Sequence, residues 1–426
     1  MTEPTSPLQI PQYRLFWISR LASVAATTGM VVVIGYQLYD VARSDYGMGI
    51  PQAALMLGLL GFAQFVPLAL LTPIAGVVAD RYDRRLVASA SIAVDLAVAV
   101  LLALATASGR VTLPLLFALA ACHGVARVFV GPAMSAIAPN IVPAALMPRA
   151  IAFNSMAWQI GAVTGPAFGG LALGMNATLP YWAAAVLLAV ACLGIFMIGP
   201  LPPPAGSRDT HPFRQIADGF RYVWNERFLL GCVTLDLFAV LLGGATALLP
   251  VFARDILHVG PDGLGLMRAA PAVGSSLVAL WLTRRPIERN VGVKMLWAVA
   301  AFGIMTIAFG FSRSFPLSLA MLALMGAADM ISVFIRSTLV QLNTPDDVRG
   351  RVSAISGLAI SASNELGEMQ SGLAAALLGA TGAVVFGGAG AIIVTIAWAF
   401  WFPELKNART FAPQYRQSHR QREQSP

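Results

Sequence analysis

The chain has 426 residues, of which 57% are hydrophobic and only 11% are charged, and its formal net charge is +8. Soluble domains carry about 25% charged residues, and a compact core cannot hide so large an apolar surface from water. The composition therefore excludes a soluble globular protein and indicates a protein that crosses a membrane several times.

Continuous apolar stretches follow one another along the chain, and each has the length of about 20 residues that crosses the hydrocarbon layer as a helix. Because these stretches do not alternate with polar residues, helices are favoured over a transmembrane barrel. We therefore predict an all-α membrane protein with twelve transmembrane helices. The predicted spans are 15–40, 53–78, 86–107, 112–138, 150–173, 180–200, 228–252, 262–282, 293–312, 315–340, 352–379 and 382–402.

The segment GVVADRYDRR joins the second and third predicted spans and places five charges within six positions. Gly76 permits a close approach of helices. Asp80, near a helix end, can interact with a neighbouring helix dipole or pair with an arginine. The alternative for Arg81, Arg84 and Arg85 is that they only anchor the loop on the cytoplasmic side. This charged hinge predicts two helices that move relative to each other, and Asp80 is the residue to test first.

Basic residues are distributed unevenly between the loops. If the N-terminus is cytoplasmic, only Arg43, Arg110, Arg254 and Arg313 fall in outer loops, and the other loop arginines fall inside. This is the positive-inside pattern, which predicts that both termini lie in the cytoplasm. The net charge thus follows from topology and indicates the lipid bilayer, and no nucleic acid, as a partner.

The chain divides near its middle at LPPPAGSRDTHP, a proline-rich polar segment that predicts a stiff linker. Two motifs echo each other across it, since Pro143–Arg149 precedes the fifth span and Pro345–Arg351 precedes the eleventh. Such repeats are typical of secondary transporters. The predicted domains are an N-terminal six-helix bundle (1–200), a cytoplasmic linker with an amphipathic helix (201–227), a C-terminal six-helix bundle (228–403) and a basic cytoplasmic tail (404–426).

The amphipathic helix follows the linker directly. Its spacing predicts a helix that lies on the cytoplasmic membrane surface, and the alternative is a solvated connector. The predicted apolar face consists of Phe213, Ile216, Ala217, Phe220, Val223 and Trp224.

The residues that usually perform catalysis or bind metals do not form a recognisable pattern. Cys122, Cys192 and Cys232 fall inside predicted spans, where we expect small buried apolar residues. The histidines are dispersed without metal-ligand spacing, so we predict no metal and no cofactor. The sequence contains no GxSxG, HExxH or GxxxxGK[ST] motif, which argues against an enzyme and against an ATP-driven pump.

Ionisable residues inside the spans are the candidates for function. A charge in hydrocarbon costs about 2.5 kcal/mol or more, so such groups face a cavity, pair with one another or bind protons. They are Arg20, Asp95, Arg127, Asp236, Arg268, Asp329, Arg336, Glu365 and Glu368.

Four of these residues suggest specific roles. Glu365 and Glu368 share a helical face, and two neighbouring carboxylates in a low dielectric suit a proton-coupling site. Asp329 and Arg336 are two turns apart on one helix and could bracket a substrate. The alternative for each acidic residue is a structural ion pair, for instance Asp95 with Arg127 or Asp236 with Arg20, and Arg268 is suited to snorkel to an interface.

Three motifs resemble the major facilitator superfamily. GVVADRYDRR is similar to the family's GxxxDRxxRR loop, although Asp83 stands where a glycine is usual. Arg127 and Gly131 match the helix-four motif, although Val130 replaces a glutamine. The helix-five motif GxxxGPxxGG of proton-coupled exporters is matched by Gly161, Gly165, Pro166, Gly169 and Gly170. The segments LPPP, DRYDRR and PDDVRGRV further resemble bacterial exporters of the enterobactin-exporter and macrolide-efflux types.

The resemblance implies two six-helix bundles related by pseudo-twofold symmetry, in a monomer of the bacterial inner membrane. It implies that the 76–85 loop latches the cytoplasmic side and that the helix-five motif seals a central cavity, the alternative being ordinary close packing of glycines. The expected function is export of an amphipathic small molecule, siderophore-like or drug-like, by alternating access and proton antiport. An importer, a lipid scramblase and a transporter-like sensor are the alternatives on the same fold.

Overall fold

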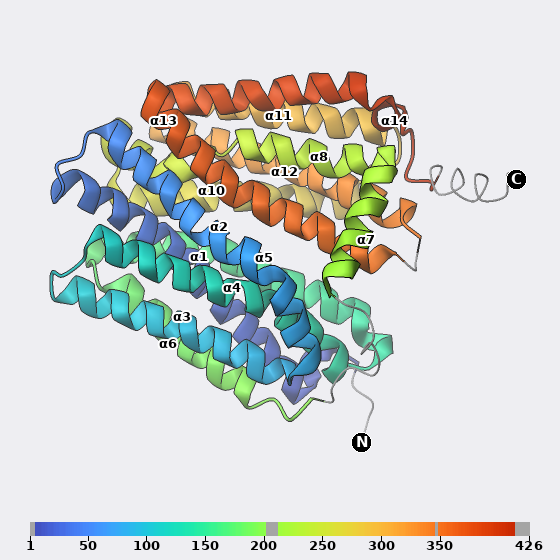
Figure 1. Cartoon of the computed structure of the whole chain (residues 1–426), viewed down its shortest axis with the longest axis horizontal. Helices are drawn as coiled ribbons and strands as arrows, with labels where there is room; N and C mark the ends of the chain where they lie inside the picture. The colour runs from blue at the N-terminus through green and yellow to red at the C-terminus, as the bar shows by residue number, and fades with distance from the viewer. Residues whose placement is uncertain (1–4, 202–211, 346–347, 414–426) are drawn as a thin grey trace, which may run out of the picture. The chain divides into compact units, whose positions relative to one another are not determined.

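The structure is a computed structural model that describes residues 5–201, 212–345 and 348–413, without the side chains of 79–80 and 212–216. Within these ranges the regular elements are all helical and no strand is present (Figure 1). This confirms the all-α prediction. Ten helices of the described residues are long and apolar enough to cross a membrane. The chain is therefore a multi-pass membrane protein.

Backbone contacts divide the chain into two compact units. The first consists of Met1–Asp209 with Leu249–Ala269, and the second of Thr210–Leu248 with Ala270–Pro426. The elements before the linker are η1 (Pro7–Gln9), α1 (Pro11–Ser44), α2 (Ile50–Arg81), α3 (Arg84–Ala107), α4 (Leu113–Ile141), η2 (Ala144–Leu146), α5 (Met147–Met175) and α6 (Leu179–Phe196). The elements after it are α7 (Pro212–Asn225), α8 (Arg227–Leu242), η3 (Ala245–Leu248), α9 (Leu249–Val251), the π-helical η4 (Phe252–Ile256), α10 (Gly260–Arg284), α11 (Val291–Phe311), α12 (Phe315–Asn343), α13 (Arg349–Trp401) and α14 (Pro403–Asn407).

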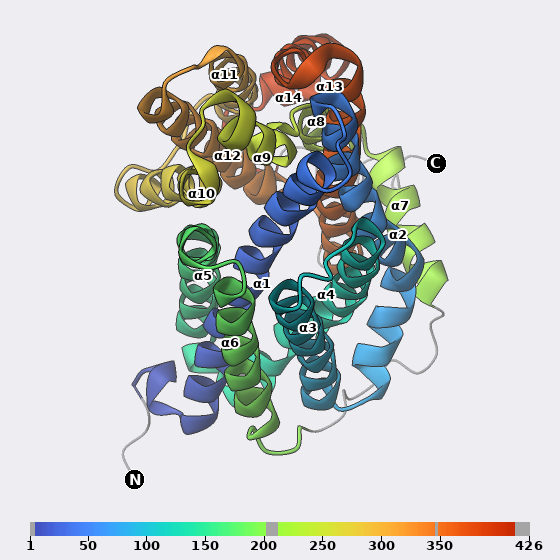
Figure 2. The same cartoon turned by 90° about the vertical axis from the view of Figure 1, so that its left-hand side faces the viewer.

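Helix starts in the first unit follow from proline and capping residues. A proline occupies the first turn of α1, α2, α4 and α5, where the missing N–H has no intrahelical partner to lose. α3 has no such proline and begins after Asp83, whose side chain caps it. In this unit α1 packs against α5 and α6, and α3 packs against α4 and α6 (Figure 2).

The seventh predicted span, 228–252, is not one helix. α8 ends at Leu242, and a 3₁₀ turn, one turn of α-helix and a π-helical turn continue the chain to Ile256. Gly243 and Gly244 lower helix propensity at the break, and Pro250 removes one backbone donor beyond it. A Cβ at Gly244 would lie 2.6 Å from the carbonyl oxygen of Gly367, so the break also lets α13 approach closely.

α13 contains two helices that meet at a kink. Gly379 has φ 73° and ψ 166°, a conformation outside the helical region that glycine adopts without a steric penalty. The kink separates the predicted spans 352–379 and 382–402 where the sequence expected them to part. α13 counts once among the ten apolar helices, and the glycine-rich α5 is not one of the ten.

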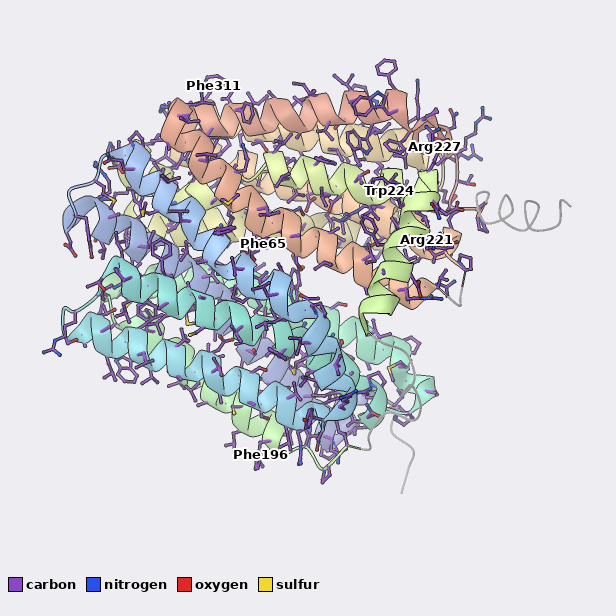
Figure 3. All side chains as sticks on the ribbon, viewed as in Figure 1. Phe65, Phe196, Arg221, Trp224, Arg227 and Phe311 are labelled. Atoms are coloured by element: carbon purple, nitrogen blue, oxygen red, sulfur yellow. The ribbon has the colours of Figure 1, made fainter. Side chains whose placement is uncertain are left out.

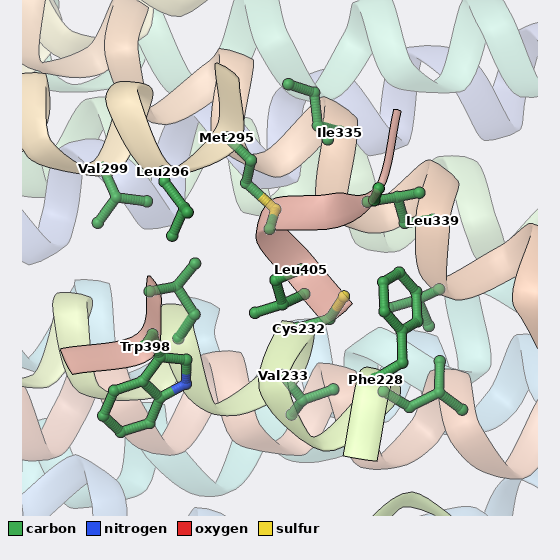
Figure 4. Close-up of a cluster of buried hydrophobic side chains, with 14 of the residues drawn as sticks. Phe228, Cys232, Val233, Met295, Leu296, Val299, Ile335, Leu339, Trp398 and Leu405 are labelled. Atoms are coloured by element: carbon green, nitrogen blue, oxygen red, sulfur yellow. The ribbon is translucent and has the colours of Figure 1, made fainter. Parts of the chain in front are cut away.

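The second unit has a core of closely packed apolar side chains (Figure 4). Packing in a membrane protein is stabilised mainly by van der Waals contact, since lipid tails are as apolar as the core itself. α8, α11, α12, α13 and α14 contribute Phe228, Cys232, Val233, Met295, Leu296, Val299, Ile335, Leu339, Trp398 and Leu405.

The three cysteines differ in burial. All are free thiols, and only Cys232 is buried as expected, in the core just described. Cys192 is partly buried and Cys122 is exposed on α4. The prediction of buried cysteines was therefore wrong for Cys122, because hydropathy identifies a span and does not identify which of its faces points inward.

α7 is an amphipathic helix, as the spacing predicted, and its place on the membrane surface stays a prediction. Val223 is buried, and Gly219 lies against Arg351 and Ile355 of α13. Phe220 and Trp224 are exposed and stack at 5.7 Å between ring centroids. Figure 3 shows Trp224 with Arg221 on α7 and with Arg227 at the start of α8. The structure does not describe the side chains of Phe213 and Ile216.

Candidate functional site

The loop between α2 and α3 is organised by Asp83. Its carboxylate accepts a hydrogen bond of 2.9 Å from the backbone N–H of Arg85 and lies 3.3 Å from the Arg85 guanidinium. A carboxylate at this position satisfies an unpaired donor and complements the helix dipole. The residue that departs from the family's glycine therefore has a clear structural role.

Arg84 and Arg85 fix the loop to two other helices of the first unit. Arg84 donates to the carbonyl oxygen of Ala136 near the end of α4, at 3.2 Å. Arg85 donates to the carbonyl oxygen of Ile198 just after α6, at 2.8 Å, and lies over the ring of Phe196. Guanidinium groups stabilise helix C-termini through their carbonyls. These contacts are those of anchors within the unit.

Within the described residues, the structure shows no contact with another helix for the remaining residues of the predicted latch. Arg81 is exposed at the end of α2. A Cβ built at Gly76 would meet no atom within 4 Å in the part of the chain that the structure describes, so the close helix approach expected there is absent. The side chain of Asp80 lies outside the described residues. A latch role for this loop stays a prediction.

The helix-five motif packs α5 tightly against α1. Cβ atoms at Gly161 and Gly165 would overlap α1 at Val24 and at the backbone of Ala25. The Thr28 hydroxyl donates to the carbonyl oxygen of Gly161 at 3.1 Å, which adds a polar contact between the two helices. Small residues allow such close approach in membrane bundles.

The C-terminal part of the same motif approaches the start of α10. A Cβ at Gly170 would lie 2.5 Å from the Cα of Gly265, and one at Gly265 would lie 2.8 Å from the carbonyl oxygen of Pro166. Gly169 lies against Gly29 of α1. The motif thus packs on both α1 and α10, and its role in sealing a cavity stays a prediction.

Asp95 and His123 form a buried polar pair between α3 and α4. Oδ1 of Asp95 lies 2.8 Å from Nδ1 of His123, and the side chains are only 3% and 2% exposed. The sequence offered Arg127 as an example of a partner for Asp95 and did not predict this contact with His123. Arg127 is exposed one turn further along α4. Arg20 of α1 is half-buried, and its Nε has no hydrogen-bond partner among the described residues.

A second set of charges lies in the second unit. Arg336 of α12 forms an ion pair through Nη1 with Oδ2 of Asp236 on α8. The sequence offered Arg20 as an example of a partner for Asp236, whereas the structure gives Arg336. Two predicted candidates, Asp236 and Arg336, are therefore brought together. Asp329 lies two turns before Arg336 on α12 and is only partly buried.

The predicted carboxylate pair lies on α13. Glu365 is buried and Glu368 is partly buried. Burial of a carboxylate in a membrane helix fits a cavity-facing or proton-binding group as well as a structural contact. Their role stays a prediction.

Sequence reasoning missed a cluster of opposite charges at the end of α1. Asp40 lies 2.9 Å from Nη1 of Arg254, and Arg43 lies 3.6 Å from Asp255. The Tyr39 hydroxyl donates to Oδ2 of Asp255 at 2.5 Å. We call these five residues the α1–η4 clasp. The sequence did contain a signal for this cluster. Each of the two segments contains one acidic and one basic residue close together, so the acid of one segment can pair with the base of the other.

Comparison with known proteins identifies relatives along nearly the whole chain. A family model described as "Transmembrane secretion effector" matches residues 2–421. The enterobactin exporter EntS of Escherichia coli is 25% identical over 415 residues, which cover 95% of this chain and 95% of that protein. The enterobactin exporter EntS of Shigella dysenteriae matches with the same identity and coverage.

Solved structures of transporters share the fold. The nucleoside transporter NupG aligns with a TM-score of 0.74 at 13% identity, over 92% of this chain and 100% of that one. The D-xylose-proton symporter aligns with a TM-score of 0.71 at 13% identity, over 92% and 98% of the two chains. At these identities the likeness is one of fold.

Proposed function

The chain belongs to the transmembrane secretion effector family of the major facilitator superfamily, and from this premise we propose that it exports an amphipathic small molecule from the cytoplasm by proton antiport. A transporter with a small-molecule substrate is the general function of this family. The proposal adds the direction of transport, the class of cargo and the coupling ion.

The full-length relation to enterobactin exporters is the observation that carries the proposal. The 25% identity extends over 95% of both chains, so it includes the helices of both units and no single motif accounts for it. A siderophore such as enterobactin is therefore the first cargo to test, and a macrolide is the second, because the loop motifs resemble both exporter types.

Twelve transmembrane helices in two six-helix bundles are the architecture that we propose for this function. Ten described helices are long and apolar enough to span a membrane. The kink at Gly379 divides α13 into two, and α5, a helix of 29 residues, packs against α1. Counting both gives twelve. Bundles of this kind bind cargo centrally and open alternately to either side.

Proton coupling is supported by acidic residues inside the helices. Asp95, Asp236 and Glu365 are buried, and Asp95 lies against His123 while Asp236 is ion-paired with Arg336. Acidic residues placed inside transmembrane helices in this way commonly form proton relays in transporters. Alternating access would couple proton uptake to movement of the cargo.

Efflux from cells tests the proposal. Cells lacking the protein should retain enterobactin or a macrolide, and the intact chain should restore efflux. Asp80→Asn and Glu365→Gln should depress efflux several-fold while membrane insertion is unchanged. Normal efflux in the deletion strain and in both variants would contradict export. If cells lacking the protein instead take up less of the compound than cells that contain it, the protein is an importer.

A further inference from the structure

α1 and α5 lie side by side in the first unit (Figure 2). The Tyr13 hydroxyl donates to the carbonyl oxygen of Ala150 at 2.6 Å, and Nε1 of Trp17 donates to that of Phe153 at 2.8 Å. The paired residues are 137 and 136 positions apart in the sequence. Both contacts advance together along the two helices, so α1 and α5 are parallel and each residue of α1 has a defined level on α5.

Arg20 belongs to the side of α1 that faces α5. It follows Trp17 by three positions and precedes Val24 by four, and Val24 lies against Gly161 of α5. Residues three and four apart share one face of a helix. The separation of 137 places Arg20 opposite Ala157. Because a helical side chain leans toward the N-terminus of its helix, Arg20 is directed toward the turn of α5 that precedes Ala157.

Asn154 lies in that turn, on the side of α5 that faces α1. Ala150 precedes it by four positions and Ala157 follows it by three, and both alanines are fully buried. Gly161, four positions further, is the residue packed against Val24. Asn154 is therefore the polar member of a row of small residues, and its level is within about one helical turn of that of Arg20.

Each of the two side chains has a buried polar atom without a partner among the described residues. Nε of Arg20 is a donor, and Oδ1 of Asn154 is an acceptor. An unpaired buried donor or acceptor lowers stability, and an arginine inside a membrane needs a counter-charge. Asp95, a buried acid of the same unit, is occupied by His123. An arginine that snorkels keeps its head group in water, whereas Nε of Arg20 is covered.

We propose that Arg20 and Asn154 bind a polar group of the cargo that has an anionic oxygen and, on a neighbouring carbon, a hydrogen-bond donor. Arg20 donates to the anionic oxygen from Nε and from a terminal nitrogen of its planar fork, as in bidentate recognition of carboxylates. Oδ1 of Asn154 accepts from the neighbouring hydroxyl or N–H group. Both side chains are partly exposed, so a solute can reach them. Charged residues inside transmembrane helices commonly mark the path of a substrate.

That the ligand is cargo rests on the proposed function, but the binding itself does not. Three probes of similar size separate the two contacts. Mandelate has a carboxylate with a hydroxyl on the adjacent carbon, phenylacetate lacks the hydroxyl, and mandelamide lacks the negative charge. Phenylacetate therefore reports on the contact with Arg20, and mandelamide reports on the contact with Asn154.

Ligand-detected saturation-transfer NMR measures the dissociation constant of each probe with the purified full-length protein. Arg20→Gln should raise the dissociation constants of mandelate and phenylacetate about tenfold, because charge-assisted hydrogen bonds are lost, and should change that of mandelamide little. Asn154→Ala should raise the dissociation constants of mandelate and mandelamide roughly fivefold and leave that of phenylacetate unchanged.

Asn154→Asp keeps the size of the side chain and supplies Arg20 with a counter-charge. This variant should lose most of its affinity for both anions, and its thermal unfolding temperature should rise. Arg14→Gln is the matched control, because Arg14 is an exposed arginine of the same helix. It should leave all three dissociation constants unchanged.

Equal affinities of the wild-type protein, Arg20→Gln and Asn154→Asp for mandelate would overturn the proposal, as would an equal loss of affinity in Arg14→Gln. An undiminished preference of Asn154→Ala for mandelate over phenylacetate would also overturn it. If the folded wild-type protein binds none of the probes, water or a contact between the two side chains satisfies both atoms, and the proposal fails. Gel filtration of each variant verifies that it is folded.

The result is separable from the proposed function. If the probes bind in the expected pattern and cells lacking the protein export cargo normally, the site exists and the export proposal fails alone. If cells lacking the protein retain cargo and the probes do not bind, this inference fails alone.

Discussion

Asp83 shows how a departure from a family pattern acquires a structural role. It stands where a glycine is usual, and its side chain caps α3. Asp83→Ala removes this cap, so the free energy of unfolding should fall by about 1 kcal/mol, measured by denaturation in detergent.

Asp83→Ser is the control for this change, because serine retains a capping oxygen and loses the ion pair with Arg85. Its stability should lie close to that of the wild-type protein. Equal losses for alanine and serine would show that the ion pair, and not the cap, stabilises the loop.

The buried contact between Asp95 and His123 predicts strong coupling between the two side chains. His123→Ala leaves the Asp95 carboxylate buried without this partner and should lower stability by about 3 kcal/mol. The double variant Asp95→Ala with His123→Ala should lose about 2 kcal/mol less than the sum of the single losses. Strict additivity in the same denaturation assay would mean that the contact contributes nothing.

Hydropathy identified the intramembrane charges, but it did not identify their partners. Asp95 and His123 are 28 positions apart, and Asp236 and Arg336 come from different helices. Which residues meet depends on helix rotation and on tertiary packing, and one sequence without its relatives does not contain that information. The pairing of Asp236 with Arg336 was therefore not predicted, although each residue was predicted as a candidate.

At the scale of elements, the contact between α1 and α5 depends on glycine. A Cβ at Gly29 would lie 2.7 Å from the carbonyl oxygen of Gly165, and one at Gly165 would overlap the backbone of Ala25. Gly165→Ala should therefore destabilise the protein by about 2 kcal/mol, since backbone cannot give way as a side chain can. Thermal unfolding in detergent measures the loss.

Gly131→Ala on α4 is the control for that experiment, since no described atom lies within 4 Å of a Cβ at Gly131. Alanine should be neutral there or slightly stabilising. If both variants unfold at the wild-type temperature, the α1–α5 contact is looser than the structure indicates.

The α1–η4 clasp predicts a modest loss of stability when one charge is inverted and a recovery when the two paired charges are exchanged. Arg254→Asp places two acidic residues together and should lower stability, whereas Asp40→Arg combined with Arg254→Asp should restore most of the loss. The Arg254 and Asp40 side chains are 26% and 47% exposed, which limits the effect to about 1 kcal/mol. No recovery in the double variant would refute a direct pairing.

The positions of the helices were easier to predict than the points at which a helix breaks. Apolar runs give the bounds of spans such as α2 and α12 to within a few residues, because the length of a span is set by the bilayer. The break around Gly243 depends on backbone conformation, and glycine permits a non-helical conformation at many positions where the chain does not adopt one. Hence the seventh span was predicted as one helix.

For the whole molecule, composition and motifs were sufficient to predict the class. A multi-pass helical transporter of the major facilitator superfamily follows from 57% hydrophobic residues together with the motifs around Gly76 and Gly161. Cargo was not predictable in the same way, because it depends on side chains that meet in a central site.

Transport by the purified protein in sealed liposomes tests the central claim most directly. A pH gradient is imposed across the membrane, and the accumulation of enterobactin is measured with and without an ionophore that collapses the gradient. We predict accumulation that requires the gradient and that falls at least several-fold in Glu365→Gln. The same two compounds, enterobactin and a macrolide, are compared in three conditions: with the gradient, without it, and in liposomes lacking the protein. If each compound accumulates equally in all three conditions, proton-driven export is contradicted.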